Sequence, residues 1–239
     1  RSALGQTIAS VLLVGGAVLG AAAALSLLGS GQVETVRLQG VLSELSPRLR
    51  IDPLAAFFAL PIYLLGAVGS LYGTGYWPQA EHPENGRKLR LCFGVLIAAL
   101  LGVVLAADGA SFLVAWEVMA LSAFLLVTTE DDRGEVRDAG WIYLVATHAS
   151  ALALFALFGL LWSVNASLAL EPVARTSSLP GTTGVVFALA LLGFGLKAGI
   201  VPMHFWLPAA HANAPSHVSA LLSGVVLKIG IYGLLRTLT

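Results

Sequence analysis

The sequence predicts an all-α fold, a polytopic transmembrane bundle of about seven helices. Two observations carry this prediction. Of the 239 residues, 57% are hydrophobic and only 11% are charged, whereas globular domains average about 25% charged residues. The apolar residues also gather in runs of roughly 18 or more, and a helix of that length crosses about 30 Å of hydrocarbon. An ordinary soluble domain is therefore excluded.

The predicted spans follow one another along the chain with short, charged connections. They cover approximately residues 7–28, 53–76, 89–107, 110–128, 139–162, 182–211 and 216–238. The longest connection, 29–52, mixes apolar and polar residues, which predicts a short extramembrane hairpin. The net charge of zero removes any case for binding nucleic acid, which needs a clustered basic surface.

Basic residues in the connections predict the orientation of the bundle, because short cytoplasmic loops carry an excess of lysine and arginine. One side of the membrane holds Arg87, Lys88, Arg90, Arg133 and Arg137. The other side holds Arg37, Arg48, Arg50 and Arg175. We expect the first side, and the N-terminus with it, to lie in the cytoplasm, with the bundle in the inner (plasma) membrane.

The sixth span carries a strong helix-breaking signal. Pro202 and Pro208 interrupt a stretch of about thirty apolar residues. Each proline removes a backbone donor and clashes with the preceding turn, so the freed carbonyls need other partners at membrane depth. We expect a helix that is broken in mid-membrane. In transporters, a hydrophobic segment interrupted in this way usually indicates an ion-binding site.

Three charged residues, Glu117, Lys197 and Lys228, fall well inside predicted spans. Each would cost about 2.5 to 3.5 kcal/mol if it faced lipid without a partner, so we expect all three to face the interior. A buried charge can gain or lose a proton when its partner moves, which makes the three a candidate proton relay. Two alternatives stay open: Glu117 docks two helices as a structural pair, and Lys197 snorkels to the interface.

Two histidines extend the candidate relay. In an ideal α-helix, His217 and Lys228 share one face and lie about 16 Å apart along the axis. A histidine that titrates near neutral pH at the helix mouth and a lysine at depth make a plausible proton path. The alternative for His217 is a plain polar residue at the helix N-terminus. His148 lies mid-span, where a packing role and a relay role are both open.

Neither the two histidines beside Pro208 nor the cysteine indicates a metal or cofactor. His204 and His211 straddle Pro208, but their spacing is not that of metal ligands. The single cysteine, Cys92, excludes a cysteine-ligated cluster. We expect no metal and no cofactor in this chain, and no catalytic residue.

The motifs taken together resemble those of a known family. They are Trp116-Glu117, Lys197, the stretch from Pro202 to His211, and the stretch from Ala214 to Gly233. With them, the chain resembles the antiporter-like, proton-conducting membrane subunits shared by respiratory complex I, multisubunit sodium/proton antiporters and group 4 hydrogenases. Within that family the nearest resemblance is to hydrogenase-4 component B and the formate hydrogenlyase membrane subunit.

The resemblance implies a role for each charged residue. Glu117 matches the family's glutamate, Lys197 the lysine on the broken helix that interacts with it, and Lys228 the deeper lysine of the next helix. Proton exchange among these groups would connect a cytoplasmic half-channel to a central polar axis, driven by a separate redox arm. The chain would then be a non-catalytic subunit of a hydrogenase-type or NADH-dehydrogenase-type complex. Its partners would be the bilayer, other membrane subunits, that arm, and protons or sodium ions.

The resemblance also implies an organisation into three parts. These are an N-terminal helix and hairpin (1–52), a helix and cytoplasmic loop (53–88), and the first five-helix proton-channel repeat (89–239). Family members carry two such inverted repeats, so we expect an N-terminal fragment. Two alternative functions are a cation/proton antiporter module and a non-transporting anchor for a redox arm.

Overall fold

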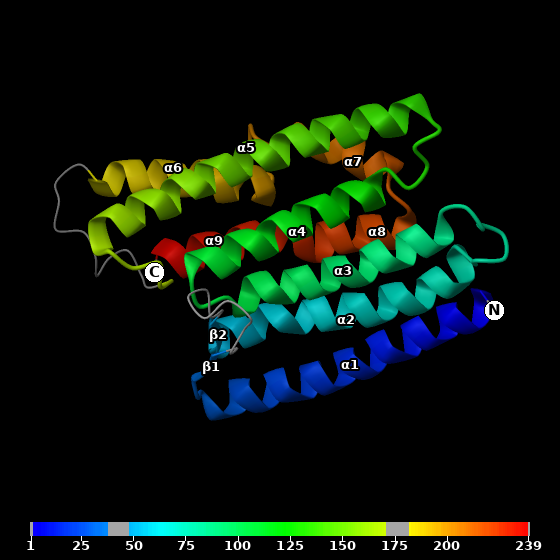
Figure 1. Ribbon diagram of the computed structural model, residues 1–239, viewed down its shortest axis with the longest axis horizontal. Helices are drawn as coiled ribbons and strands as arrows, with labels where there is room; N and C mark the ends of the chain where they lie inside the picture. Colours follow the sequence, from blue (N-terminus) through cyan, green and yellow to red (C-terminus); the bar gives the residue numbers. More distant parts are fainter. Residues whose placement is uncertain (1, 38–47, 171–181, 239) are drawn as a thin grey trace.

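The computed structural model describes residues 2–37, 48–170 and 182–238. Its helices lie side by side and form a bundle (Figure 1), which confirms the predicted all-α class. In chain order the first six are α1 Ser2–Ser30, α2 Pro53–Tyr76, α3 Gly86–Leu105, α4 Gly109–Val127, α5 Gly134–Asn165 and α6 Thr182–Ala198. The chain continues through α7 Leu207–Asn213, α8 Ser216–Leu221, the π-helical turn η2 Leu222–Val226, and α9 Leu227–Leu238.

The predicted spans correspond to these helices one by one. Six apolar helical stretches are long enough to cross a membrane, namely those of α1 to α5 and the continuous stretch Ser216–Leu238 that includes α8, η2 and α9. The sixth predicted span is divided between α6, an apolar helix of 17 residues, and the shorter α7. The chain is therefore a multi-pass membrane protein with one broken span.

Aspartates set the starts of two spans. The Asp52 carboxylate accepts a hydrogen bond from the backbone N–H of Ala55 at 2.9 Å, and Pro53 occupies the first helical position of α2. Asp108 accepts from the backbone N–H of Ser111 at 2.8 Å at the start of α4. Both are N-caps, which satisfy donors that the first turn of a helix leaves free.

The expected hairpin is present at one end of the bundle. Strands β1 Glu34–Arg37 and β2 Arg48–Ile51 pair antiparallel, and β2 is joined to the α3–α4 connection by a bridge between Leu49 and Ala106. Figure 1 places the N-terminus and the α2–α3 and α4–α5 connections at the opposite end. The two groups of loops used for the orientation are thus separated as expected, although Arg175 lies outside the described residues.

The core of the bundle lies between α3, α4, α6 and α9, while α1 packs at the edge, mainly on α2. Fully buried aromatic rings of α4 and α6 meet in this core, and the ring centroids of Trp116 and Phe194 are 5.6 Å apart. Glu117, the next residue of α4, lies beside α5, where a carboxylate oxygen is 4.0 Å from His148.

Candidate functional site

The broken span begins at Gly199, directly after α6. Gly199 adopts φ of 69°, in the left-handed region that glycine favours. The carbonyl of Leu196, in the last turn of α6, accepts a hydrogen bond from the backbone N–H of Gly199 at 3.3 Å and another from the buried indole N–H of Trp206 at 2.9 Å. Helical structure resumes at Leu207, with Pro208 in the first turn of α7. The helix break is thus confirmed, and the Trp206 side chain adds a second hydrogen bond to a carbonyl at the end of α6.

Lys197 lies in the last turn of α6, immediately before the break. Its side chain is buried, with 1% of the residue exposed. The ammonium donates a hydrogen bond to the hydroxyl oxygen of Tyr143 on α5 at 2.8 Å and lies 5.0 Å from the centre of that ring. Lys197 therefore faces the interior, as expected, and does not snorkel to the interface. The role of Tyr143 was not visible in the sequence, where it is one aromatic residue in an apolar run.

Glu117 lies on α4, opposite α5. One carboxylate oxygen is 4.0 Å from Nε2 of His148, and the carboxylate also interacts electrostatically with the Lys197 ammonium. The Nδ1 atom of His148 is 3.0 Å from the backbone oxygen of Leu144. With the ring proton on Nδ1, this hydrogen bond leaves Nε2 facing the Glu117 carboxylate. The structure thus brings together Glu117, Lys197 and His148.

Lys228 does not join this group. It is exposed on α9, where its ammonium donates to the backbone oxygen of Ser223 at 2.6 Å, so the expectation that it faces the interior of this chain is wrong. The reason is the π-helical turn η2, in which the N–H of Leu227 bonds to the oxygen of Leu222, five residues back. The wider turn rotates α9 relative to α8. His217 is buried while Lys228 is exposed, so the predicted shared face is also wrong.

The other histidines lie apart from the Glu117 group. His217 is buried among the rings of Tyr72, Tyr76 and Phe93, with centroid distances of 6.3, 6.0 and 5.6 Å, and it borders a cavity between α1, α2, α3 and α8. His211 on α7 pairs through Nδ1 with the Ser219 hydroxyl at 2.8 Å. His204 is exposed in the segment between α6 and α7.

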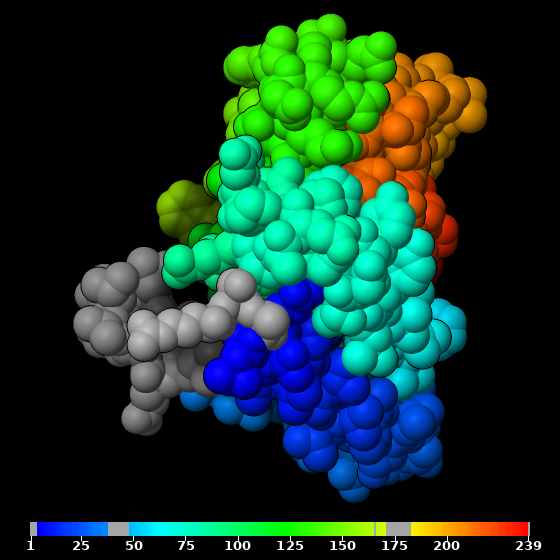
Figure 2. Space-filling view, turned by 90° about the vertical axis from the view of Figure 1, so that its right-hand side faces the viewer, coloured from blue at the N-terminus to red at the C-terminus, as the bar shows by residue number. Residues whose placement is uncertain are grey.

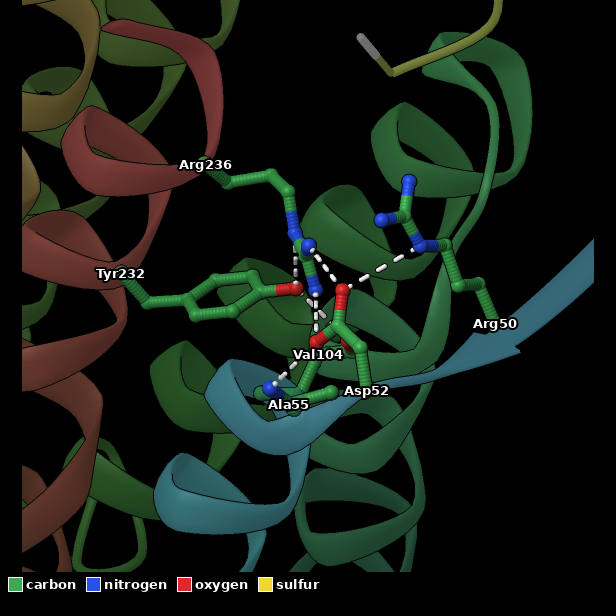
Figure 3. A network of polar contacts seen from close by, with 6 residues as sticks. All are labelled: Arg50, Asp52, Ala55, Val104, Tyr232 and Arg236. Carbon is green, nitrogen blue, oxygen red and sulfur yellow. Dashed lines mark hydrogen bonds and ion pairs between the residues drawn. The ribbon is translucent and has the colours of Figure 1, made fainter. Parts of the chain in front are cut away.

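A second buried polar group ties the hairpin end of the bundle together (Figure 3). Both terminal guanidinium nitrogens of Arg236 on α9, Nη1 and Nη2, donate to Asp52, at 2.5 and 3.0 Å. Nε of Arg236 donates to the Tyr232 hydroxyl, which donates to the Val104 carbonyl at 2.7 Å. Arg50 adds an ion pair to Asp52 at 3.2 Å.

The ion pairs and hydrogen bonds of Asp52 affect its pKa more strongly than its burial does. Burial alone raises the pKa of this carboxyl, but the hydrogen bonds from Arg236 and Ala55 and the charges of Arg236 and Arg50 hold the pKa below its usual value. Sequence reasoning missed this network because Asp52 and Arg236 are 184 positions apart and both sit at helix ends, where charges are common.

Residues 106–239, more than half of the chain, match the family model described as "NADH:quinone oxidoreductase/Mrp antiporter, TM". The chain belongs to this family. The chain is 38% identical to hydrogenase-4 component B of Escherichia coli K12 over 188 residues, which are 79% of this chain and 28% of that relative. It is 34% identical to formate hydrogenlyase subunit 3 of the same organism over 201 residues, which are 84% of this chain and 31% of that relative.

The antiporter-like subunit also resembles a solved membrane complex in fold. A chain of the membrane-bound sulfane sulfur reductase, described as an archaeal respiratory membrane complex, superposes with a TM-score of 0.77 at 24% identity, covering 98% of this chain and 39% of that one. The resemblance noted in the sequence is confirmed. The chain is an antiporter-like membrane subunit, it spans about a third of the length of these relatives, and such relatives are subunits of larger membrane assemblies.

Proposed function

We propose that this antiporter-like subunit carries protons along part of the path across the bilayer, as one half-channel of a redox-driven membrane complex. The observation that supports the proposal is Lys197, a buried ammonium at a helix break, bonded to Tyr143 and in electrostatic reach of Glu117. A charged group inside the membrane is costly without a partner. An ionisable residue at such a place is therefore, by default, a candidate functional residue.

The proposed relay works through the charge on Glu117. When His148 passes a proton to Glu117, the carboxylate is neutralised and Lys197 loses the negative charge that stabilises its ammonium. Lys197 then releases its proton towards the break. When Glu117 gives up its proton, the neutral amine of Lys197 takes it up, which restores the charges of both groups. Lys228, on the exposed face of α9, would receive the proton only where another segment or subunit covers it. These steps need no cofactor in the chain.

Proton transport in sealed vesicles that contain the complete complex tests the proposal. We expect Glu117→Gln and Lys197→Ala each to abolish redox-linked proton uptake, because each removes a proton-exchanging group. Glu135→Gln, the same change at an exposed carboxylate in the first turn of α5, serves as the control and should leave uptake unchanged. Wild-type uptake in both relay variants would refute the proposal.

Two other functions make different predictions in the same vesicles. The family description includes Mrp antiporters, which favours a cation/proton exchange module as the second candidate. In that case a sodium gradient alone should move protons, without any redox substrate. If the chain is a membrane anchor for a redox arm, the relay variants should reduce the amount of assembled complex and leave uptake per complex unchanged.

The proposed setting follows the sequence expectations. The partners are other membrane subunits and a peripheral redox arm, the membrane is the bacterial inner membrane, and the N-terminus faces the cytoplasm. In this setting residues 89–239 form the half-channel repeat, residues 53–88 contribute a helix and a cytoplasmic loop, and residues 1–52 contribute a flanking helix and hairpin.

A further inference from the structure

A cavity of about 580 Å³ lies between α1, α2, α3 and α8. This volume falls in the range of about 300 to 1,000 Å³ that is typical of sites for small molecules. Along α1 the lining runs from Gln6 to Ala17, and along α3 it runs from Leu89 to Leu101. At 1.5 Å per residue the walls are about 16 and about 18 Å long, close to half of the roughly 30 Å hydrocarbon core. The cavity therefore has the depth of one membrane leaflet.

The lining changes from polar to apolar along this depth. At the end near the N-terminus, Gln6 donates to the Thr74 carbonyl at 3.4 Å and accepts from the backbone N–H of Gln79 at 3.1 Å, and Arg90 lies at the same end. Figure 2 looks onto this end of the molecule, where the first residues of α1 lie against α2 and α3. Deeper in the membrane the lining is mostly apolar and includes Leu13, Ala17, Ile97 and Leu101, with Tyr63 as the one described residue there that carries a polar group. This gradient matches an amphiphile with its head at the membrane surface.

Arg90 is a cation without a counter-ion among the described residues. One of its terminal nitrogens donates to the side-chain oxygen of Gln79, and the other, Nη1, is buried with no hydrogen-bond partner within the described part of the chain. No ion pair to Arg90 occurs among the described residues, whereas the neighbouring Lys88 pairs with Asp131 at 3.7 Å. The charge of Arg87 also acts on Arg90. A guanidinium has five N–H donors, so an anionic group is the missing complement.

We propose that this cavity binds a membrane phospholipid with an anionic head group, its phosphate on Arg90 and one acyl chain between α1 and α3. Arginine binds phosphate oxygens with a planar pair of donors, and basic pockets between transmembrane helices on the cytoplasmic side suit anionic lipid heads. A neutral apolar molecule would leave Arg90 without a counter-ion, and a free phosphate ion would leave the apolar depth unfilled. A phospholipid occupies both ends of the cavity, with its head group on Arg90 and its acyl chain in the apolar depth.

Native mass spectrometry of the intact membrane protein in detergent, with phosphatidylglycerol or phosphatidylcholine added, tests the head-group contact. The wild type should retain phosphatidylglycerol about fivefold better than phosphatidylcholine. The attraction between one basic side chain and an anionic membrane surface corresponds to about that ratio of affinities. Arg90→Gln should remove the preference and Arg90→Lys should restore part of it. Arg87→Gln is the control, because Arg87 does not line the cavity, and it should keep at least half of the preference.

Two adjacent glycines of α1 test the acyl-chain contact. A Cβ added to Gly15 or Gly16 meets no atom within 4 Å, so a leucine at either position is compatible with the fold. Only Gly16 lines the cavity. We expect Gly16→Leu to lower phosphatidylglycerol retention several-fold and Gly15→Leu to leave it unchanged. Equal retention of the two lipids by the wild type, an unaltered preference in Arg90→Gln, or equal retention in the two glycine variants would overturn the proposal.

Discussion

The hydrogen bond between Lys197 and Tyr143 holds a positive charge inside the bundle, and its loss should be measurable. Tyr143→Phe keeps the ring that packs on Trp206 and removes only the hydroxyl acceptor. A buried hydrogen bond to a charged group contributes about 1.5 to 3 kcal/mol, so we expect a loss of unfolding free energy of that size in detergent. Tyr72→Phe changes the same group on an exposed ring and should have no effect. An equal effect of both substitutions would contradict this role for Tyr143.

The Asp52–Arg236 ion pair should make stability depend on pH in the acid range. The folded pKa of Asp52 is lowered, so the ionised carboxylate is favoured in the folded state. Its contribution is complete above the unfolded pKa of about 3.9 and is lost as the pH falls through the lower folded pKa. We therefore expect the melting temperature of the wild type to fall on acidification below about pH 4.

Asp52→Asn isolates this charge, because the amide oxygen can still accept the hydrogen bond from Ala55 that caps α2. Leaving the buried Arg236 without its anion should cost about 3 to 5 kcal/mol at neutral pH. The variant should also lose the part of the acid dependence that comes from this group. If the variant melted at the wild-type temperature at pH 7, the network would not be a stabilising contact.

Among the elements, the break after α6 depends on one backbone conformation. Gly199 has φ of 69°, and a Cβ there would run into the side chain of Leu207. Gly199→Ala should therefore destabilise the protein by more than about 1 kcal/mol. Gly159→Ala, inside α5 with no atom within 4 Å of the new Cβ, should stabilise it by up to about 1 kcal/mol. Thermal unfolding of the two variants should show shifts of opposite sign, and a shift of the same sign would contradict the strain at Gly199.

The π-helical turn shows where helical periodicity misleads. The spacing of His217 and Lys228 predicts one face only if every turn between them is α-helical. Five residues, Leu222–Val226, adopt the wider turn, so Lys228 leaves the face on which His217 is buried. Nothing local in this apolar segment distinguishes an α-turn from a π-turn. The segment packs closely on another helix, and at Gly224 an added Cβ would overlap the side chain of Leu65 on α2.

At the scale of the whole molecule, local properties were predictable and distant contacts were not. The spans follow from runs of apolar residues, and the break follows from two prolines. Both effects are local, because hydrophobicity and the missing N–H of proline act on the segment that contains the residue. The interior position of Lys197 followed from the cost of a charge in lipid. Its partner Tyr143 is 54 positions away, and which helices become neighbours is decided by tertiary packing.

The arrangement of loops at two ends of the bundle makes a final prediction about topology. The only cysteine, Cys92, is buried, so the wild type should react little with a membrane-impermeant maleimide. Gln32→Cys and Glu84→Cys place exposed thiols at the two opposite ends of the bundle. In intact cells we expect labelling of Gln32→Cys, and labelling of Glu84→Cys only after the membrane is opened, because the basic loop of Glu84 is expected in the cytoplasm. The reverse pattern would invert the orientation and leave the fold intact. Labelling of both from the same side would contradict an odd number of crossings between these positions, and with it the assignment of α2 as a span.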